Sequence, residues 1–253
     1  LRAISTFSVG YDQIDVKHAK KKKIRIGYTP EVLTEATADL TFSLILDLLR
    51  RVTEGDRITR KGDWRQIYGA YDYVGVDLAG KTLGILGLGR IGQAVAKRAA
   101  GFGVNVIYHN RKRASRKIES LTRAKFESIN GLLKKSDVIS VHVPYTKQTH
   151  QLVDMKFLKK MKKSAFLVNT TRGKIIKERD LVLALRKKII SGAALDVFEN
   201  EPIGKNHPLT KMQNVVLAPH IGSSTVETRK KMAELTVKNL KLALSGKKPI
   251  YSV

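Results

Sequence analysis

The chain contains no cysteine, and it has no long uninterrupted hydrophobic run. Without cysteine there can be no disulfide, no thiolate metal site and no cysteine nucleophile, and a reducing cytoplasm is permitted. The apolar stretch Leu40–Leu49 is short and carries Asp47, with Arg50 and Arg51 beside it, so it predicts a buried amphipathic helix and not a membrane span. No secretory or transit segment opens the sequence. We therefore expect a cytoplasmic protein with no membrane partner.

Acidic residues are also scarce, because 22 Asp and Glu stand against 48 Lys and Arg, which gives a formal net charge of +26 at pH 7. Such an excess is typical of proteins that bind nucleic acid or acidic surfaces. Here, however, the basic residues form short clusters along the whole chain, without interleaved aromatic residues or a known nucleic-acid module. We interpret the charge as a basic surface that attracts anionic cofactor and substrate, and we do not expect nucleic acid as a partner. The clusters are Lys20–Lys23, Arg111–Arg113, Lys159–Lys163, Arg186–Lys188, and Lys247 with Lys248.

With 253 residues and 42% hydrophobic content, the chain can bury a substantial core. From Leu78 onward, short apolar runs typical of strands alternate with helical periods. This alternation predicts an α/β fold with a doubly wound parallel sheet and helices on both faces. The expected strands are Thr82–Leu86, Val104–Tyr108, Val138–Val143, Ala165–Asn169, Gly192–Val197 and Val215–Ala218.

Two long helices and one irregular segment are expected around this sheet. The segment from Glu31 to about Lys61 is predicted as one long helix, with Gly55 as the position of any break. Val226–Leu244 is predicted as a closing helix that ends at Gly246. The segment Gly62–Asp77 is rich in Gly, Asp and Tyr, which indicates an ordered loop or arm.

The most informative motif is the run GILGLGRIG at Gly84–Gly92, which lies between a strand-like and a helix-like segment. In such a motif Gly87 permits a tight turn, Gly89 lets the backbone approach a pyrophosphate, and Gly92 lets the helix pack closely on the strand. The N–H groups at the start of the helix favour anionic oxygens. We therefore predict a dinucleotide site here, with a fortuitous glycine-rich turn as the alternative. Its residues are Gly87, Leu88, Gly89, Arg90, Ile91 and Gly92.

The residues after the second expected strand bear on which dinucleotide is bound. NAD is usually held there by a carboxylate about twenty residues past the glycines. This chain has Asn110, Arg111, Lys112 and Arg113 instead. Asn110 can bond a ribose hydroxyl, and the cations can pair with a 2′-phosphate. We predict that NADP(H) is preferred and that NAD(H) is a weaker cofactor; an ordinary solvated basic turn is the alternative.

Polar residues follow three of the later strands, where ligands bind in an open parallel sheet. Arg172, Glu201 and His220 can together reduce a ketone beside a carboxylate. The guanidinium holds the acid, the imidazole protonates the alkoxide, and the carboxylate favours the imidazolium. Alternatively, the three are an ion-pair partner, a solvated loop residue and a turn histidine. We expect no metal site, because metal-ligand spacing is absent among the other histidines, which are His18, His109, His142, His150 and His207.

Six runs match one family in order and spacing over nearly the whole chain. The chain resembles the D-2-hydroxyacid dehydrogenases, and within them the glyoxylate/hydroxypyruvate reductase branch. This resemblance implies a Rossmann domain and NAD(P)-dependent reduction of a small 2-ketoacid to the D-2-hydroxyacid. The runs are STFSVGYDQIDV (Ser5–Val16), GILGLGRIG, VHVPYTKQTHQLV (Val141–Val153), LVNTTRGKII (Leu167–Ile176), GAALDVFENEP (Gly192–Pro202) and VLAPHIGSST (Val216–Thr225).

The resemblance also implies roles for individual residues. Arg172 matches the residue that binds the substrate and polarises its carbonyl, Glu201 the partner of the histidine, and His220 the proton donor. The backbone N–H groups of Val9 and Gly10 match the site of the substrate carboxylate. Asp196 matches the residue that holds the nicotinamide carboxamide, and Pro144 and Thr149 match those on the adenine side. The cofactor set is completed by Val143, Thr170, Thr171, His220 and Gly222.

The family pattern also suggests the domain organisation. Members carry several tens of residues before the STFSVG motif, and this chain carries four, so it resembles a truncated member. Residues 1–29, joined by 226–253, are expected to be the remnant of a smaller α/β substrate domain, and residues 30–225 the dinucleotide-binding domain. The helix and arm at 31–77 match the interdomain segment through which members dimerise, so a homodimer is expected.

Two further features narrow the expected activity. Glutamate at position 201 fits ketoacid reduction and differs from the amide of the formate-oxidising relatives. We also expect the protein to differ from the many phosphoglycerate dehydrogenases that carry a regulatory tail. Glyoxylate and hydroxypyruvate are the expected substrates. One alternative is a catalytically silent dinucleotide-sensing or co-repressor protein on the same fold, although such a protein would not need Arg172, Glu201 and His220. Another is a fragment that is inactive because its substrate domain is incomplete.

Overall fold

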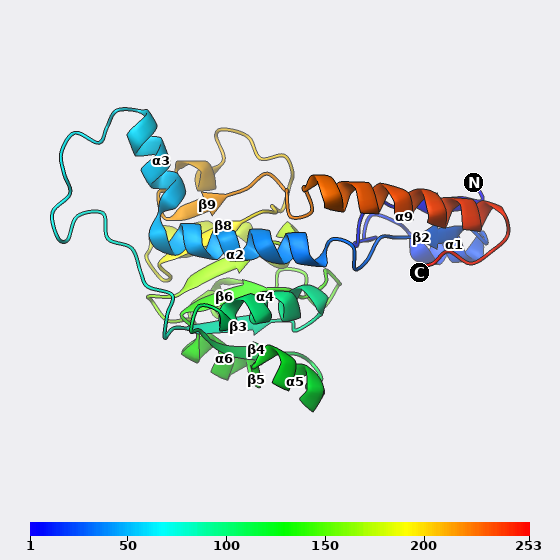
Figure 1. Cartoon of the computed structure of the whole chain (residues 1–253), viewed down its shortest axis with the longest axis horizontal. Coiled ribbons are helices and arrows are strands. Elements are labelled where there is room, and N and C mark those ends of the chain that lie inside the picture. The colour runs from blue at the N-terminus through cyan, green and yellow to red at the C-terminus, as the bar shows by residue number, and fades with distance from the viewer. The chain divides into compact units, whose positions relative to one another are not determined.

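The computed structural model describes every residue of the chain, Leu1–Val253. The chain forms two compact units (Figure 1). Unit 1 consists of Leu1–Thr37 and Gly222–Val253, and unit 2 of Ala38–Ile221. No helix is both long enough and apolar enough to cross a membrane.

Unit 2 is built around a seven-stranded sheet in which all neighbouring strands are parallel. The strand order is β5-β4-β3-β6-β7-β8-β9, so the chain moves outward from β3 first to one side and then to the other. Ligands bind at the switch point between two such halves, which here lies between β3 and β6. The strands are β3 (Thr82–Leu86), β4 (Asn105–His109), β5 (Lys125–Phe126), β6 (Val138–Val141), β7 (Phe166–Asn169), β8 (Gly192–Leu195) and β9 (Val215–Leu217).

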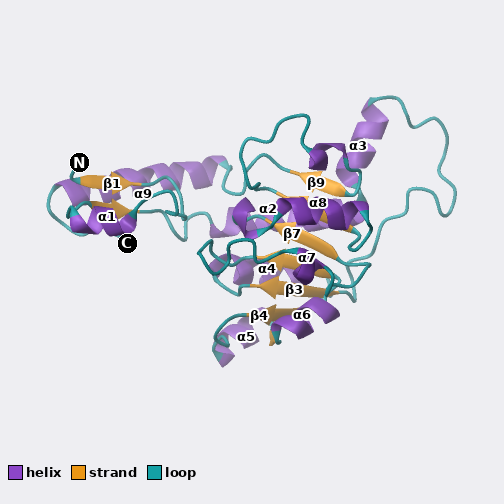
Figure 2. Cartoon of the chain, turned by 180° about the vertical axis from the view of Figure 1, so that it is seen from behind, coloured by secondary structure: helices purple, strands orange, loops and turns teal.

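The predicted doubly wound sheet is confirmed, and all six predicted strands are present with ends shifted by at most two residues. Alternate residues of a strand face opposite cores, as the period of two requires. In β7, Val168 packs into the core formed with α2 and α4, whereas Leu167 packs into the core formed with α6, α7 and α8. Figures 1 and 2 show these helices on the two faces of the sheet. The helices are α2 (Thr34–Arg50), α4 (Arg90–Ala100), α5 (Arg116–Thr122), α6 (Ile129–Lys135), α7 (Met155–Leu158) and α8 (Glu178–Arg186).

The single long helix predicted before the arm is wrong, because the chain breaks at Arg51 and continues as α3 (Val52–Arg60). Arg51 has a left-handed backbone with φ of 57°. The Asp47 side chain accepts the Thr53 N–H at 2.7 Å and also bonds the Thr53 hydroxyl, so it supplies the cap that starts the second helix. Gly55, the expected break, lies inside α3, where a Cβ would make ordinary contacts of 3.4 Å and more with Tyr73 of the arm.

Unit 1 joins segments from both parts of the chain around a small parallel sheet. The buried Asn239 is central to it, because its Nδ2 donates to the Tyr28 carbonyl at 2.9 Å and its Oδ1 accepts the Ile250 N–H at 2.9 Å. The closing helix has the predicted bounds. The elements of unit 1 are β1 (Ala3–Ser5), α1 (Val16–Lys21), β2 (Arg25–Gly27) and α9 (Val226–Leu244).

Candidate active site

The glycine loop between β3 and α4 is shaped by contacts that exclude side chains. Gly87 has φ of 104°, and a Cβ there would lie 2.7 Å from the carbonyl carbon of His142. A Cβ on Gly92 would lie 2.3 Å from the Gly87 oxygen, so only glycine lets α4 approach the turn this closely. In contrast, a Cβ on Gly89 would meet nothing within 4 Å. The loop therefore has two glycines fixed by packing and one that leaves its outer face open.

Asn110 helps to hold this loop. Its Oδ1 accepts the Leu88 N–H at 2.7 Å, and the neighbouring His109 carbonyl accepts the Gly87 N–H at 3.0 Å. The last residue of β4 and the first residue after it thus stabilise the turn after β3, a role that the sequence did not indicate. The Asn110 Nδ2 is left to donate to another acceptor, such as a ribose hydroxyl.

The three cations after Asn110 are not equivalent. Arg113 makes two bonds of 2.9 Å to Glu119, which also accepts the Tyr108 hydroxyl at 2.6 Å. These bonds lower the pKa of Glu119 to about 2, and those from Arg113 have the largest effect. Arg113 is therefore neutralised by a local carboxylate, whereas Arg111 Nη1 donates to the neutral Gln148 Oε1 at 3.1 Å and Lys112 is exposed. Arg111 and Lys112 are the cations of this segment that can meet an added anion.

The segment after β6 contains a buried histidine beside the glycine loop. His142 Nε2 lies 2.7 Å from the Ser140 hydroxyl, and burial lowers the pKa of His142 to about 4, so the ring is neutral at pH 7. Farther along, the Thr149 hydroxyl donates to the Pro144 carbonyl at 2.7 Å and closes a turn that begins directly after Val143. This turn also carries Gln148, the partner of Arg111.

The turn after β7 presents Arg172. The buried Asn169 organises it, because its Oδ1 accepts the Thr171 N–H at 3.0 Å and its Nδ2 donates to the Arg172 carbonyl at 3.0 Å. Thr170 is buried and exchanges a hydroxyl hydrogen bond of 2.8 Å with Thr41 of α2. The predicted site residues of this turn therefore have defined structural partners, and their backbone positions are fixed from both sides.

Glu201 and His220 are brought together, with Glu201 Oε2 at 2.6 Å from His220 Nδ1. Glu201 Oε1 accepts the Phe198 N–H at 2.8 Å, so both carboxylate oxygens are used. His220 has a left-handed φ of 54°, and the fully buried Asp196 accepts the next N–H, that of Ile221, at 2.8 Å. With Nδ1 turned to Glu201, the Nε2 of His220 is the nitrogen that can serve a substrate.

The Arg172 and Glu201 segments are also in backbone contact. A Cβ on Gly173 would lie 1.8 Å from the Phe198 carbonyl carbon, so the two turns touch where no side chain can intervene. The remaining predicted residues lie in unit 1, with Val9 and Gly10 in the loop after β1 and Gly222 at the start of its second segment. No group of three or more His, Asp or Glu side chains is arranged to hold a metal ion.

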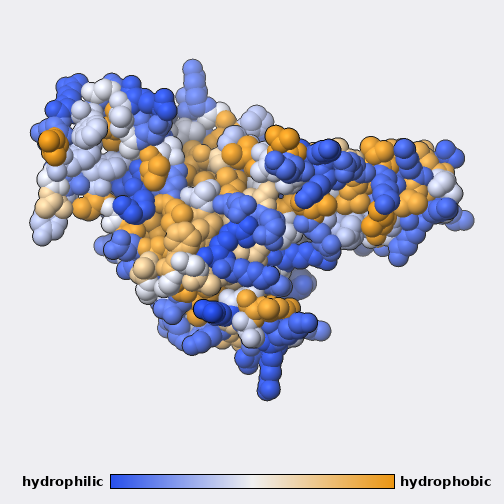
Figure 3. All heavy atoms as spheres, viewed as in Figure 1, coloured by the Kyte–Doolittle hydropathy of each residue, from blue (hydrophilic) through white to orange (hydrophobic).

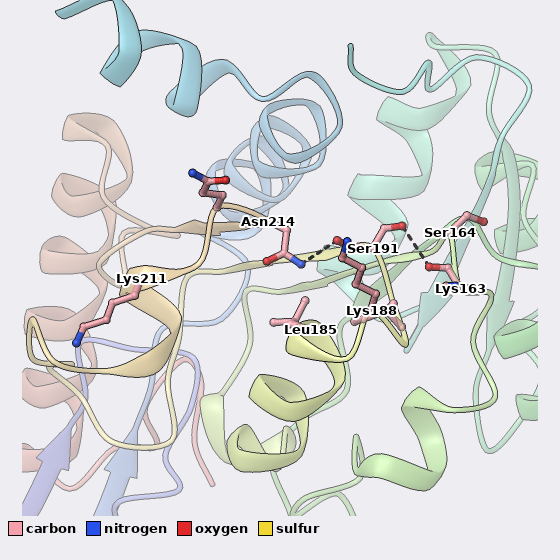
Figure 4. A pocket seen from close by; sticks show the side chains of 9 residues that line it. Lys163, Ser164, Leu185, Lys188, Ser191, Lys211 and Asn214 are labelled. Carbon is pink, nitrogen blue, oxygen red and sulfur yellow. Dashed lines mark hydrogen bonds between the residues drawn. The ribbon is translucent and has the colours of Figure 1, made fainter. Parts of the chain in front are cut away.

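A depression of about 880 Å³ lies at the amino-terminal ends of β7, β8 and β9 (Figure 4). The residues that line it include Lys163, Lys188, Lys211 and Asn214. None of the predicted site residues lines it. The Asn214 and Ser191 side chains bond main-chain carbonyls there, so they support the strand ends. This depression is separate from the edge that carries the glycine loop and the Glu201–His220 pair.

Comparisons with known proteins identify related sequences and structures. The family model described as "D-isomer specific 2-hydroxyacid dehydrogenase, NAD binding domain" matches residues 42–222. A glyoxylate reductase from Thermofilum pendens is 48% identical over 249 residues, which cover 98% of this chain and 74% of the relative. A crystal structure of a Thermus thermophilus protein has a TM-score of 0.93 at 45% identity, over all of this chain and 79% of that one. An NADPH-dependent glyoxylate/hydroxypyruvate reductase from Sinorhizobium meliloti, in complex with NADP and malonate, has a TM-score of 0.92 at 37% identity, over all of this chain and 77% of that one.

The glycine loop generates a paired prediction. Gly92→Ala should destabilise unit 2 by about 1–3 kcal/mol, because the new methyl group overlaps the Gly87 oxygen. In an ordinary helix the same change stabilises by about 1 kcal/mol, so the sign is diagnostic. Gly89→Ala should leave stability within about 0.5 kcal/mol of the wild type but weaken NADPH binding about tenfold or more, because the methyl group occupies the open face.

Thermal or denaturant unfolding and fluorescence titration with NADPH measure the two effects. Equal stability of the two variants would contradict the packing role of Gly92. Unchanged NADPH affinity in Gly89→Ala would contradict the cofactor assignment of the loop.

Proposed function

Because the chain belongs to the D-isomer specific 2-hydroxyacid dehydrogenase family and is an NAD(P)-dependent oxidoreductase, we propose that it reduces glyoxylate and hydroxypyruvate to the D-2-hydroxyacids with NADPH. The observation that carries the proposal is the Glu201–His220 pair at 2.6 Å, which follows β8 and β9 at the same edge of the sheet as the glycine loop. A catalytically silent protein on this fold would not need that pair. The silent alternative is therefore not favoured.

The residues of unit 2 fit a dinucleotide. The open face at Gly89 leaves space for a pyrophosphate at the N-terminus of α4, whose N–H groups attract anionic oxygens. Pro144, Thr149 and Asp196, on the later turns, are proposed as further cofactor ligands because they match the family positions that contact the cofactor. When bound, the nicotinamide supplies the hydride for ketone reduction.

In the proposed mechanism the chain provides charge and a proton. The Arg172 guanidinium binds the substrate carboxylate and polarises the ketone. The Nε2 of His220 gives a proton to the ketone oxygen as the alkoxide forms, while Glu201 holds the ring through Nδ1 and compensates its positive charge. The backbone N–H groups of Val9 and Gly10 remain proposed contacts of the substrate carboxylate, and unit 1 is proposed to belong to the substrate domain.

The preference for NADPH is supported by the pairing of the cations after β4. Arg113 is held by Glu119, whereas Arg111 bonds only a neutral amide and Lys112 is exposed. No carboxylate stands where NAD enzymes carry one, since this position is Asn110. The Sinorhizobium meliloti reductase, which is named NADPH-dependent, agrees with this choice of cofactor.

Activity assays test the proposed reaction. The chain should oxidise NADPH in the presence of glyoxylate or hydroxypyruvate, and His220→Asn should lower kcat on the order of a thousandfold because the proton donor is lost. Glu201→Gln should lower kcat by about tenfold to a hundredfold, since the ring keeps a neighbour but loses its charge partner. His18→Asn, on an exposed helix of unit 1, is the control. Full activity in His220→Asn, or no ketoacid-dependent oxidation by the wild type, would refute the mechanism.

Cofactor preference is tested at Arg111. We expect Arg111→Ala to raise the KM for NADPH about tenfold and to leave the KM for NADH within about twofold, because only NADPH carries the 2′-phosphate. Lys117→Ala removes one positive charge from the neighbouring α5 and should change neither value. The same ratio of the two KM values in wild type and Arg111→Ala would show that this cation does not select the cofactor.

A homodimer is proposed from the arm at 62–77, which runs out from the body of unit 2 in Figures 1 and 2. Trp64 is 55% exposed, and Ile67 and Tyr71 are each 91% exposed. Figure 3 shows hydrophobic residues on this part of the surface among hydrophilic ones. Large apolar side chains at this exposure are typical of surfaces that a partner covers, and a second copy of the chain is the partner that fits an oligomeric enzyme.

Sedimentation velocity at micromolar concentration checks the dimer. The wild type should sediment with twice the chain mass, and the double variant Ile67→Lys with Tyr71→Lys should sediment as a monomer, since two charges would be buried in the interface. A monomeric wild type, or a dimer unaffected by both lysines, would rule out the arm as the interface.

A further inference from the structure

The loop that carries Glu201 is bonded by a second carboxylate, which belongs to the helix α8. Glu178, the first residue of α8, has a side chain only 12% exposed. Its Oε2 accepts the Glu199 N–H at 2.9 Å, and its Oε1 lies 2.6 Å from Nε2 of His207. Glu199 and His207 flank Glu201 on either side along the chain. The Glu178 side chain therefore bonds both ends, Glu199 and His207, of the segment that presents Glu201 to His220.

The His207 end of this segment is fixed in the core of unit 2. His207 Nδ1 accepts the Leu209 N–H at 3.3 Å, so Nε2 carries the ring proton and donates it to Glu178. Leu209 is fully buried, and the short 3-10 turn that it belongs to, Pro208–Lys211, precedes β9. One ring tautomer of His207 satisfies both bonds.

The Glu199 end of this segment is fixed as well. Phe198 and Glu199 lie in backbone contact with Gly173, and Gln151 Nε2 donates to the Glu199 side chain at 3.3 Å. Between the two ends, Glu201 and Pro202 are exposed, and Glu201 bonds His220 and the Phe198 N–H. The His207 N–H donates to the Gly204 carbonyl within the loop. Glu178 is thus the side chain that connects both ends to one rigid helix.

We propose that Glu178 is a positioning residue for catalysis, which acts through the segment Glu199–His207 to keep Glu201 in contact with His220. The inference rests on the proposed function, in which Glu201 supports His220 as the proton donor. Small displacements of a supporting group reduce catalysis strongly, because the transition state requires fixed geometry. Glu178 touches neither Glu201 nor His220, so its effect is carried by the loop backbone.

Steady-state kinetics of Glu178→Ala and Glu178→Gln test the proposal. Glu178→Ala should lower kcat about tenfold while the KM for NADPH stays within about twofold. Glu178→Gln should recover only part of kcat, because its amide oxygen still accepts the Glu199 N–H while its NH2 group faces the Nε2–H of His207 and cannot accept it. Asp180→Asn is the matched control: it removes a carboxylate from the same helical turn, but Asp180 bonds the Met155 N–H and not the loop. Wild-type kcat in Glu178→Ala would overturn the proposal.

A double-mutant cycle separates positioning from a merely structural role. In a Glu201→Gln background, Glu178→Ala should lower kcat by less than about twofold, because the group it positions has been disabled. A further tenfold loss there would overturn the proposal, and so would a drop in the unfolding temperature that accounts for the lost activity. If Glu178→Ala does not fold, the same cycle with Glu178→Gln decides: its reduction of kcat must vanish in the Glu201→Gln background.

Failure of the proposed function gives a different result. In that case either the wild type shows no ketoacid-dependent oxidation of NADPH, or Glu201→Gln and His220→Asn are themselves fully active, whatever Glu178 does. Loss of activity in those two variants with no effect of Glu178→Ala leaves the proposed function intact and removes only the positioning role.

Discussion

The parallel hydrogen-bond ladder of the large sheet aligns the strand ends, and the site depends on that alignment. Leu86, Val141, Asn169, Leu195 and Leu217 are successive partners across β3, β6, β7, β8 and β9. Each is the last residue of its strand, so the turns that follow leave from one row at one edge. A slip of one residue in any pair would turn the following side chains to the opposite face and separate the glycine loop from the Glu201–His220 pair.

Close backbone contacts then join these turns in pairs. Gly87 lies against the main chain of His142, and Gly173 lies against that of Phe198 and Glu199. At such distances there is no free volume to absorb a displacement, because protein interiors are packed as densely as organic crystals. The glycine loop is thus linked to the end of β6, and the Arg172 turn to the Glu201 loop. The shape of the site is set by the main chain before any ligand is considered.

The sequence predicted the strands and the phosphate loop because hydrophobic period and glycine spacing are local properties. It could not predict the break at Arg51, where the backbone becomes left-handed and the Asp47 side chain accepts the Thr53 N–H in the first turn of the next helix. It predicted a ribose contact for Asn110, which stays a prediction, and it did not indicate that the Asn110 oxygen holds the glycine loop. The partnership of Glu178 with His207 left no sequence signal, because each residue is ordinary in its own segment and their contact is created by the packing of α8 against the sheet. Pairwise side-chain contacts between distant segments are what pattern analysis lacks.

The composition of unit 1 has a consequence for how the molecule is made. Unit 2 is continuous in sequence, so every residue it needs has been synthesised before the last segment appears. Unit 1 needs Asn239 to bond both Tyr28 and Ile250, which brings together residues from the first and the last parts of the chain. The segment Leu1–Thr37 can therefore complete these bonds only after Gly222–Val253 has been synthesised. The whole of unit 2 is thus available for folding before both segments of unit 1 are.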